Sequence, residues 1–290
     1  MSNGIVRFTA NVLAGLFGFT SGVIRNARTF HPDGRTFQGT VQSVNPTDPS
    51  LALAAKQLEG RVLMRIGMGV MKKGMPAWLA NHIPDAPSIA VRFCSTSIRG
   101  ELTVERREDD LDLLCTAGGD RLSKLIWNLA TGGKKYGLDQ FDYFHNFYYA
   151  DVPYKIDDDK LEGWIRLAAD VATSQPTPNG SRDAKSREQG LTSAATNHAI
   201  IRIEIQRVGS KQAPFVPIAE IRFGKEIQLD QEALHFYPFA ARGFNPHGVY
   251  TELRKRVYPA SVRKRAPTKA ERDARENESI VKRLVRYFRK

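Results

Sequence analysis

The sequence predicts an α+β fold in which an antiparallel β-sheet is flanked by helices. The first observation is the alternation of Ile201, Ile203 and Ile205 with polar residues, which is typical of a half-buried strand. Further strands are indicated by short runs of alternating apolar residues at 36–41, 87–96 and 215–223. The second observation is a helical spacing of apolar residues at 51–78 and 160–171, which predicts the flanking helices.

Three other segments have a distinct composition. Residues 5–24 are mostly apolar, but Arg7 and several glycines argue against a membrane-spanning helix, so we expect a packed or interfacial helix. Residues 174–192 are rich in Ser, Pro, Gly, Asn and charged residues, which predicts a loop. Residues 279–290 place apolar residues on one face and Lys or Arg on the other, so they are expected to bind anionic lipid or to pack against a subunit.

The composition limits the classes of protein to which the chain can belong. Its 290 residues suffice for one large domain or two small ones with a substantial core. The net charge of +12 suggests an acidic partner, and the basic residues are densest towards the C-terminal end. Cys94 and Cys115 give no disulfide framework, which favours a reducing compartment. No stacking platform or recognition motif predicts specific binding of nucleic acid.

A run of basic residues from Leu253 to Arg265 contains a single tyrosine. On a helix Arg254 lies one turn before Tyr258, and Arg265 returns to the same stripe two turns after it. A guanidinium held against a phenol favours the phenolate, which is a hard anionic ligand suited to ferric iron. The alternative interpretation is a surface tyrosine on a solvated basic helix, and Pro259 places a bend or a helix start near it.

This run resembles the proximal helix of haem catalases. The family pattern is an Arg, three residues, the ligand Tyr, and a second Arg seven residues later. The resemblance implies that Tyr258 is the proximal ligand of the iron of haem b, that Arg265 binds a propionate, and that Arg254 tunes the ligand. The family's Asp two residues after the Tyr is absent, because Ala260 and Ser261 occupy that neighbourhood.

Three upstream segments resemble catalase segments in the family's order. The spacing Arg28-x-x-His31-x-x-Gly34 before a strand resembles the distal segment. It implies that His31 shuttles a proton between the two peroxide oxygens and that Arg28 contacts a propionate. The strand containing Arg92 resembles Val-Arg-Phe-Ser-Thr, which makes Arg92 a second propionate-binding arginine. The segment that begins at Asp112 resembles the Asp-Leu that precedes Gly-Asn-Asn in the family.

The predicted distal side departs from the family at several positions. Phe30 replaces a small or β-branched residue before the distal histidine, and Cys94 stands where the family has a serine. Residues 116–118 are Thr-Ala-Gly and contain no asparagine to orient peroxide. Efficient dismutation of hydrogen peroxide is therefore not expected. The aromatic run at 141–149 could line a haem channel or belong to an ordinary core, and the sequence leaves both interpretations open.

The resemblance implies a catalase-like antiparallel β-barrel with flanking helices over residues 28–266. An apolar arm at 1–27 precedes it, and a basic amphipathic tail at 267–290 follows it. It points to the short catalase-related branch, which includes mini-catalases, organic-peroxide peroxidases and allene oxide synthase-like enzymes. The favoured function is a haem-dependent peroxidase that reacts with organic or lipid hydroperoxides and dismutates hydrogen peroxide weakly.

Three other functions stay open at this stage. The first is a fatty-acid hydroperoxide lyase or isomerase of the allene oxide synthase type. The second is a non-catalytic haem-binding sensor or carrier on the same fold, and the third is a membrane-associated structural protein without haem. N-terminal arms in this family often cross a neighbouring subunit, so a homo-oligomer is expected. The expected location is cytoplasmic, with peripheral contact to an anionic membrane through the C-terminal tail.

Overall fold

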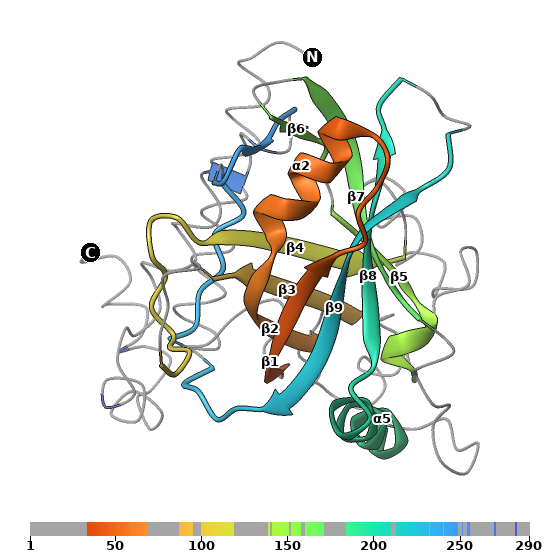
Figure 1. Ribbon diagram of the computed structural model, residues 1–290. Helices are drawn as coiled ribbons and strands as arrows, with labels where there is room; N and C mark the ends of the chain where they lie inside the picture. Colours follow the sequence, from red (N-terminus) through yellow and green to blue (C-terminus); the bar gives the residue numbers. More distant parts are fainter. Residues whose placement is uncertain are drawn as a thin grey trace.

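A closed antiparallel β-barrel forms the centre of the computed structural model (Figure 1). The structure describes residues 34–68, 87–94, 100–118, 139, 141–150, 152–157, 160–170, 184–209, 213–231, 233–239, 241–248, 251, 254–255, 270 and 282. The predicted arm at 1–27 and most of the tail at 267–290 lie outside these residues, as do Arg28, His31, Tyr258 and Arg265. Among the described residues, none of the helices is long and apolar enough to cross a membrane.

Eight strands close the barrel in the order β7-β5-β4-β3-β2-β1-β9-β8, and β8 pairs back to β7. These strands are β1 (Gly34–Ser43), β2 (Gly60–Met68), β3 (Pro87–Phe93), β4 (Leu111–Ala117), β5 (Phe147–Ala150), β7 (Leu161–Ala169), β8 (Ile200–Arg207) and β9 (Val216–Glu226). Two short strands, β6 (Tyr154–Ile156) and β10 (Phe244–Pro246), extend the sheet beside β7. All of these pairings are antiparallel, so the α+β class with an antiparallel barrel is confirmed.

The barrel interior is filled by side chains. Alternate residues of each strand point inward, and an eight-stranded barrel is just wide enough for such residues to meet. The rings of Phe37 and Phe223 lie 4.6 Å apart between centroids, and Phe144 meets Phe223 edge-on at 5.9 Å. Tyr143, Phe144 and Tyr148 belong to this core, whereas Phe147 is half exposed. The aromatic run therefore contributes mainly to ordinary core packing.

In the described part of the chain, two helices and one short 3-10 helix pack on the barrel. Helix α2 (Pro49–Leu58) begins at Asp48, whose carboxylate accepts hydrogen bonds from two backbone N–H groups of the first turn, and it packs against β1 and β9. Helix α5 (Ala184–Thr196) packs against β9 and the 3-10 helix η3 (Tyr143–His145), and it lies at the lower end of the barrel in Figure 1. Arg35 connects α5 to the barrel, because it donates hydrogen bonds to the Glu188 carbonyl and to the Glu226 carboxylate.

Three predicted elements were wrong. The helix predicted over 51–78 is present only to Leu58, as part of α2, and residues 60–68 form β2 instead. Residues 62–68 are buried on both faces, so the alternation typical of a strand is not visible there, and residues 69–78 lie outside the described part. The helix predicted over 160–171 is strand β7, in which Leu161, Gly163, Ile165 and Leu167 alternate inward. The loop predicted over 174–192 contains part of α5, whose Leu191 and Ala194 pack into the barrel core. The strands predicted at 36–41, 87–96, 201–206 and 215–223 are confirmed as β1, β3, β8 and β9.

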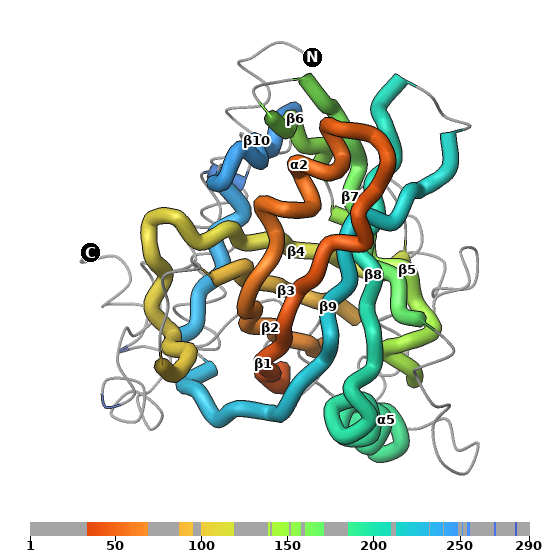
Figure 2. The backbone as a smooth tube through the Cα atoms, in the orientation of Figure 1, coloured from red at the N-terminus to blue at the C-terminus, as the bar shows by residue number. Residues whose placement is uncertain are grey.

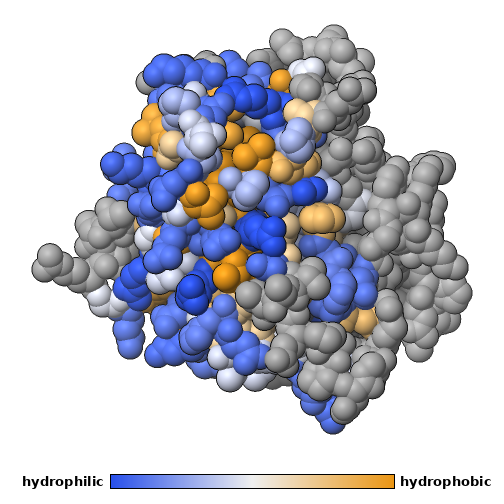
Figure 3. Space-filling model, turned by 45° about the vertical axis from the view of Figure 1, so that its right-hand side comes forward, coloured by the Kyte–Doolittle hydropathy of each residue, from blue (hydrophilic) through white to orange (hydrophobic). Residues whose placement is uncertain are grey.

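The outer surface of the barrel carries separate exposed apolar side chains. Figure 3 shows hydrophobic patches among hydrophilic residues on one face of the described part. Arg166 stacks between Phe147 and Phe215, with its guanidinium carbon 4.2 and 4.1 Å from the ring centroids, and it also pairs with Glu204. Exposed apolar residues of this kind are usual on folded proteins, so they indicate no particular partner.

A second, smaller core lies on the outer wall of the barrel. After β9 the chain runs along the outside of the barrel to β10, beside the loop between β3 and β4 (Figure 2). The buried residues of this second core are Leu63, Cys94, Leu102, Leu234 and Phe236, of which the last two belong to the segment after β9. This outer core is what positions the buried charged residues described next.

Candidate functional site

A buried ion pair crosses β3 and β4 on the outer wall of the barrel. The antiparallel register places Arg92 of β3 opposite Asp112 of β4 and opposite Leu63 of β2. Alternation along these strands turns this row away from the barrel interior, where Val91, Phe93 and their neighbours lie. The side chains of Arg92 and Asp112 are 1% and 0% exposed, because the chain after β9 covers them.

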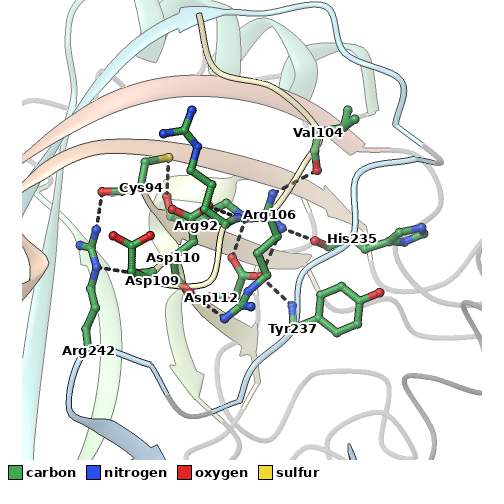
Figure 4. Close-up of polar contacts among 11 residues, drawn as sticks. Arg92, Cys94, Val104, Arg106, Asp109, Asp110, Asp112, His235, Tyr237 and Arg242 are labelled. Atoms are coloured by element: carbon green, nitrogen blue, oxygen red, sulfur yellow. Dashed lines mark hydrogen bonds and ion pairs between the residues drawn. The ribbon is translucent and has the colours of Figure 1, made fainter. Parts of the chain in front are cut away.

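Arg92 makes four hydrogen bonds in this setting (Figure 4). Its Nε and Nη2 donate to the two carboxylate oxygens of Asp112 at 2.9 and 3.2 Å, and Nη1 donates to the Val104 carbonyl at 3.1 Å. Its Nη2 also donates to the carbonyl of His235. A guanidinium has five N–H groups, so four of the five are already bound within the protein.

Asp112 is held by more than Arg92. Its Oδ2 accepts the Tyr237 backbone N–H at 2.7 Å and lies 3.5 Å from Nε of Arg106. Burial raises the pKa of the Asp112 carboxyl above its usual range, and the hydrogen bonds and charge of Arg92 act in the opposite direction. The guanidinium carbon of Arg92 also lies 5.3 Å from the centroid of the Phe236 ring. Both partners therefore fix the covering segment as well as each other.

Arg92 is buried and paired with Asp112, unlike an arginine that is open to solvent or to a ligand. A propionate at this place would meet a cation whose charge is already balanced by Asp112. The predicted propionate role of Arg92 stays a prediction, and its contacts now give it a second role in holding residues 235–237 against the barrel.

A second buried arginine lies on the outer wall near the start of β1. Arg65 is 3% exposed, and its Nε donates to Oε1 of Gln231 at 2.9 Å. A Cβ on Gly34 would lie 2.5 Å from the guanidinium carbon of Arg65, so the glycine makes room for this side chain. Gly34 is the last residue of the predicted distal motif, and this contact is a packing reason for a glycine at that position.

The Cys94 thiol, predicted in the distal neighbourhood, lies in the outer core. It is buried, and its sulfur donates to the carbonyl of Arg92 at 3.7 Å. Burial raises the pKa of the Cys94 thiol to about 11. The thiol is therefore protonated at neutral pH and behaves as a small apolar group.

This protonation state predicts slow alkylation of Cys94. At pH 8 a pKa of about 11 leaves roughly one thiol in a thousand as thiolate, so iodoacetamide should label native Cys94 at least ~100-fold more slowly than the unfolded chain. Mass spectrometry of a Cys115→Ser variant, in which only Cys94 can react, measures this ratio with and without urea. Labelling of the native protein at the rate of free glutathione would contradict the assignment.

The region that leads to the predicted proximal tyrosine contains a buried cation. Thr251, Arg254 and Lys255 have helical backbone, with Thr251 and Arg254 buried and Lys255 exposed. Arg254 is 8% exposed and therefore faces the protein. A buried guanidinium four residues before a tyrosine in the sequence is the residue chemistry that would favour a phenolate ligand, so the burial of Arg254 is compatible with the predicted haem site.

The other predicted haem contacts cannot be placed in this way. His31, Arg28, Tyr258 and Arg265 lie outside the described residues. Within the described part of the chain, no group of three or more His, Cys, Asp or Glu side chains could hold a metal ion. The structure thus pairs Arg92 with Asp112 and buries Arg254. The positions of these residues relative to Arg28, His31, Tyr258 and Arg265 stay predictions.

Sequence reasoning missed two contributors to this region. Arg92 and Asp112 are the sole charged residues of β3 and β4 and have opposite signs, which was a readable signal for a cross-strand ion pair. Arg242 was also missed. It donates to the carbonyls of Gln57, Cys94 and Asp109, and acceptors on the backbone leave no pattern in the sequence.

Comparison with known proteins supports the fold. No protein-family model matches the sequence, and no curated protein matches it significantly. Among solved structures, the chain is similar to a fungal catalase, with a TM-score of 0.57 and 13% identity over 83% of this chain and 60% of the catalase. It is also similar to a bacterial catalase, with a TM-score of 0.53 and 13% identity over 86% of this chain and 59% of that protein. The chain thus spans about 60% of the length of these catalases, and the likeness establishes a catalase-like fold.

Proposed function

We propose that this catalase-like barrel binds haem b and reacts with hydroperoxides as a peroxidase. The observation that carries the proposal is the buried Arg254 on helical backbone, four residues before Tyr258 in the sequence, in a chain with a catalase-like fold. A tyrosinate that ligates iron is the anion that this position of Arg254 is suited to stabilise.

The residues of the chain have separate roles in this proposal. Tyr258 ligates the iron on the proximal side, and Arg254 favours the phenolate form of that ligand. Arg28 and Arg265 bind the propionates, with Arg92 as a third candidate. When bound, haem supplies the redox-active iron needed for cleavage of the peroxide O–O bond.

His31 supplies the acid–base chemistry on the distal side. Its imidazole would accept the proton of the hydroperoxide O–H group and deliver it to the other peroxide oxygen, which would leave as water or an alcohol, with the two electrons for O–O cleavage supplied by haem. The absence of an asparagine at 116–118 removes a donor that would orient hydrogen peroxide. Together with Phe30 beside His31, this favours organic or lipid hydroperoxides as substrates.

Replacing Tyr258 with Phe should abolish stable haem binding. The substitution removes the phenolate oxygen and leaves a ring of nearly the same volume, so the loss is one of ligation. We expect the wild-type protein to retain one haem per chain after desalting and the Tyr258→Phe variant to retain almost none. Absorption at the Soret band, relative to protein concentration, measures the retained haem.

A matched control is Tyr149→Phe, a half-buried tyrosine on β5 that the proposal leaves outside the haem site. It should retain haem as the wild type does. Equal retention of haem by Tyr258→Phe and the wild-type protein would remove the ligand role of Tyr258, and the proposal would fail with it.

A further inference from the structure

Arg242 is bound to three backbone carbonyls that come from three separate parts of the chain. Its Nε donates to the carbonyl of Asp109 at 2.8 Å, Nη1 donates to that of Gln57 at 3.1 Å, and Nη2 donates to that of Cys94 at 2.5 Å. The carbonyl of Gln57 is one of the last four of α2, which lack partners within the helix. Cys94 directly follows β3, and Asp109 lies in the turn that precedes β4 (Figure 4).

The backbone of Arg242 is held in a conformation that such a residue rarely adopts. Its φ is 50°, in the left-handed region, and Gly243 follows with a φ of 73°. A non-glycine residue in this region is strained and persists where surrounding contacts impose the conformation. Backbone hydrogen bonds in both directions between Ala241 and Phe244 close a tight turn around Arg242 and Gly243, and such a turn has positive φ at both central residues. The three hydrogen bonds of the guanidinium attach this turn to the barrel wall.

The chain on both sides of Arg242 is tied to the barrel as well. On the N-terminal side, Arg92 donates to the carbonyl of His235, and Asp112 accepts the N–H of Tyr237. On the C-terminal side, β10 pairs with β6, and the N–H of His247 donates to the carbonyl of Pro153 at 3.1 Å. The helical backbone at Thr251 and Arg254 begins a few residues later. Arg242 therefore lies between contacts that attach the chain to the barrel on both sides.

We infer that Arg242 is a positioning residue, which sets where the chain leaves the barrel wall and thereby places the helical backbone at Thr251 and Arg254 that precedes Tyr258 in the sequence. The consequence for haem rests on the function proposed above. A lysine could not replace Arg242, because its single ammonium cannot donate along the three separate directions that the planar guanidinium serves. Because the three acceptors are neutral carbonyls, the directions of the N–H groups matter more for these hydrogen bonds than the charge of the side chain.

Hydrogen exchange of the haem-free protein followed by mass spectrometry tests the inference without depending on the cofactor. In Arg242→Ala, amides in peptides that cover 235–258 should exchange at least about tenfold faster than in the wild type. The variant lacks the three hydrogen bonds of the guanidinium, which oppose local unfolding of this segment. Peptides of β8, which is separated from β3 by three strands of the barrel, should exchange as in the wild type. Arg242→Lys should give an intermediate increase, and it replaces the Ala variant if that variant does not fold.

A control arginine and a haem measurement complete the test. Arg202 lies on β8 and forms an ion pair with Asp170. The control variant Arg202→Lys alters this pair and should leave hydrogen exchange of residues 235–258 unchanged. If Arg242→Lys and Arg242→Ala exchange like this control, the inference is overturned. With haemin added, both variants at Arg242 should bind about tenfold or more weakly than the wild type, and equal affinity would overturn the positioning role. A wild-type protein that takes up no haem would defeat the proposed function alone, because the exchange result would still decide the role of Arg242.

Discussion

Replacing Asp112 with Ala should destabilise the folded protein by about 3–5 kcal/mol, which is the usual cost of leaving a buried charge without its partner. The guanidinium of Arg92 would keep its place beneath residues 235–237 with no carboxylate to balance it. The backbone N–H of Tyr237 would lose its acceptor at the same time. Urea unfolding at pH 7, followed by tryptophan fluorescence, measures the change in the free energy of unfolding.

Two further variants separate the charge effect from general damage. Asp170→Ala removes one partner of the part-exposed pair with Arg202 and should cost no more than about 1 kcal/mol. The double variant Arg92→Met with Asp112→Leu should recover most of the stability that Asp112→Ala loses. Burial already raises the pKa of Asp112, which means that its charged form is disfavoured in the fold, and removing both charges removes that penalty. A loss in Asp112→Ala no larger than that in Asp170→Ala would contradict the account of this pair.

Replacing His31 with Ala should lower the second-order rate constant for hydroperoxide reaction by about 10²–10⁴-fold, which is the usual contribution of a positioned acid–base group. Haem content should be unchanged, because His31 is assigned to proton transfer and Tyr258 to ligation. Stopped-flow absorption spectroscopy with cumene hydroperoxide, on protein loaded with haemin, gives the rate constant.

The matched control for this variant is His145→Ala. His145 is exposed and pairs locally with Asp142 at 2.6 Å, so its removal should leave the rate within about threefold of the wild type. If His31→Ala also reacted at the wild-type rate while keeping its haem, the chain would be a haem carrier or sensor on this fold, and the peroxidase assignment would fall.

The strands that could be predicted from the sequence are those with one buried face. In β8, Ile201, Ile203 and Ile205 point into the barrel while their neighbours face outward, so a period of two is visible. Strand β2 is buried on its outer face by the second core, and this removes the alternation that would have identified it. In β7 the alternation is present but weak, because an inward position is occupied by Gly163, which fits against Ile205.

The candidate site could be predicted only in part, for a related reason. Arg254 is buried, whereas the stripe that it is predicted to share with Tyr258 and Arg265 stays a prediction, because those two residues lie outside the described part of the chain. The lone opposite charges of β3 and β4 indicate that Arg92 and Asp112 could pair, but the register that places them directly opposite each other is not given by sequence spacing. The role of Arg242 depends on carbonyl groups of residues 57, 94 and 109, whose side chains are irrelevant to the contact. Helix α5 likewise depends on tertiary contacts, among them the bond from Arg35 to the carbonyl of Glu188.

The central claim is that Tyr258 ligates haem in a barrel that reacts with hydroperoxides, and an absorption spectrum tests it most directly. The purified protein is supplied with one equivalent of haemin, and spectra are recorded before and after addition of hydrogen peroxide and then of cumene hydroperoxide. The account predicts a Soret band of high-spin ferric, tyrosinate-ligated haem that changes faster with cumene hydroperoxide. Absence of a bound-haem Soret band after haemin is supplied would contradict it, and the likeness to catalases would then concern the fold alone.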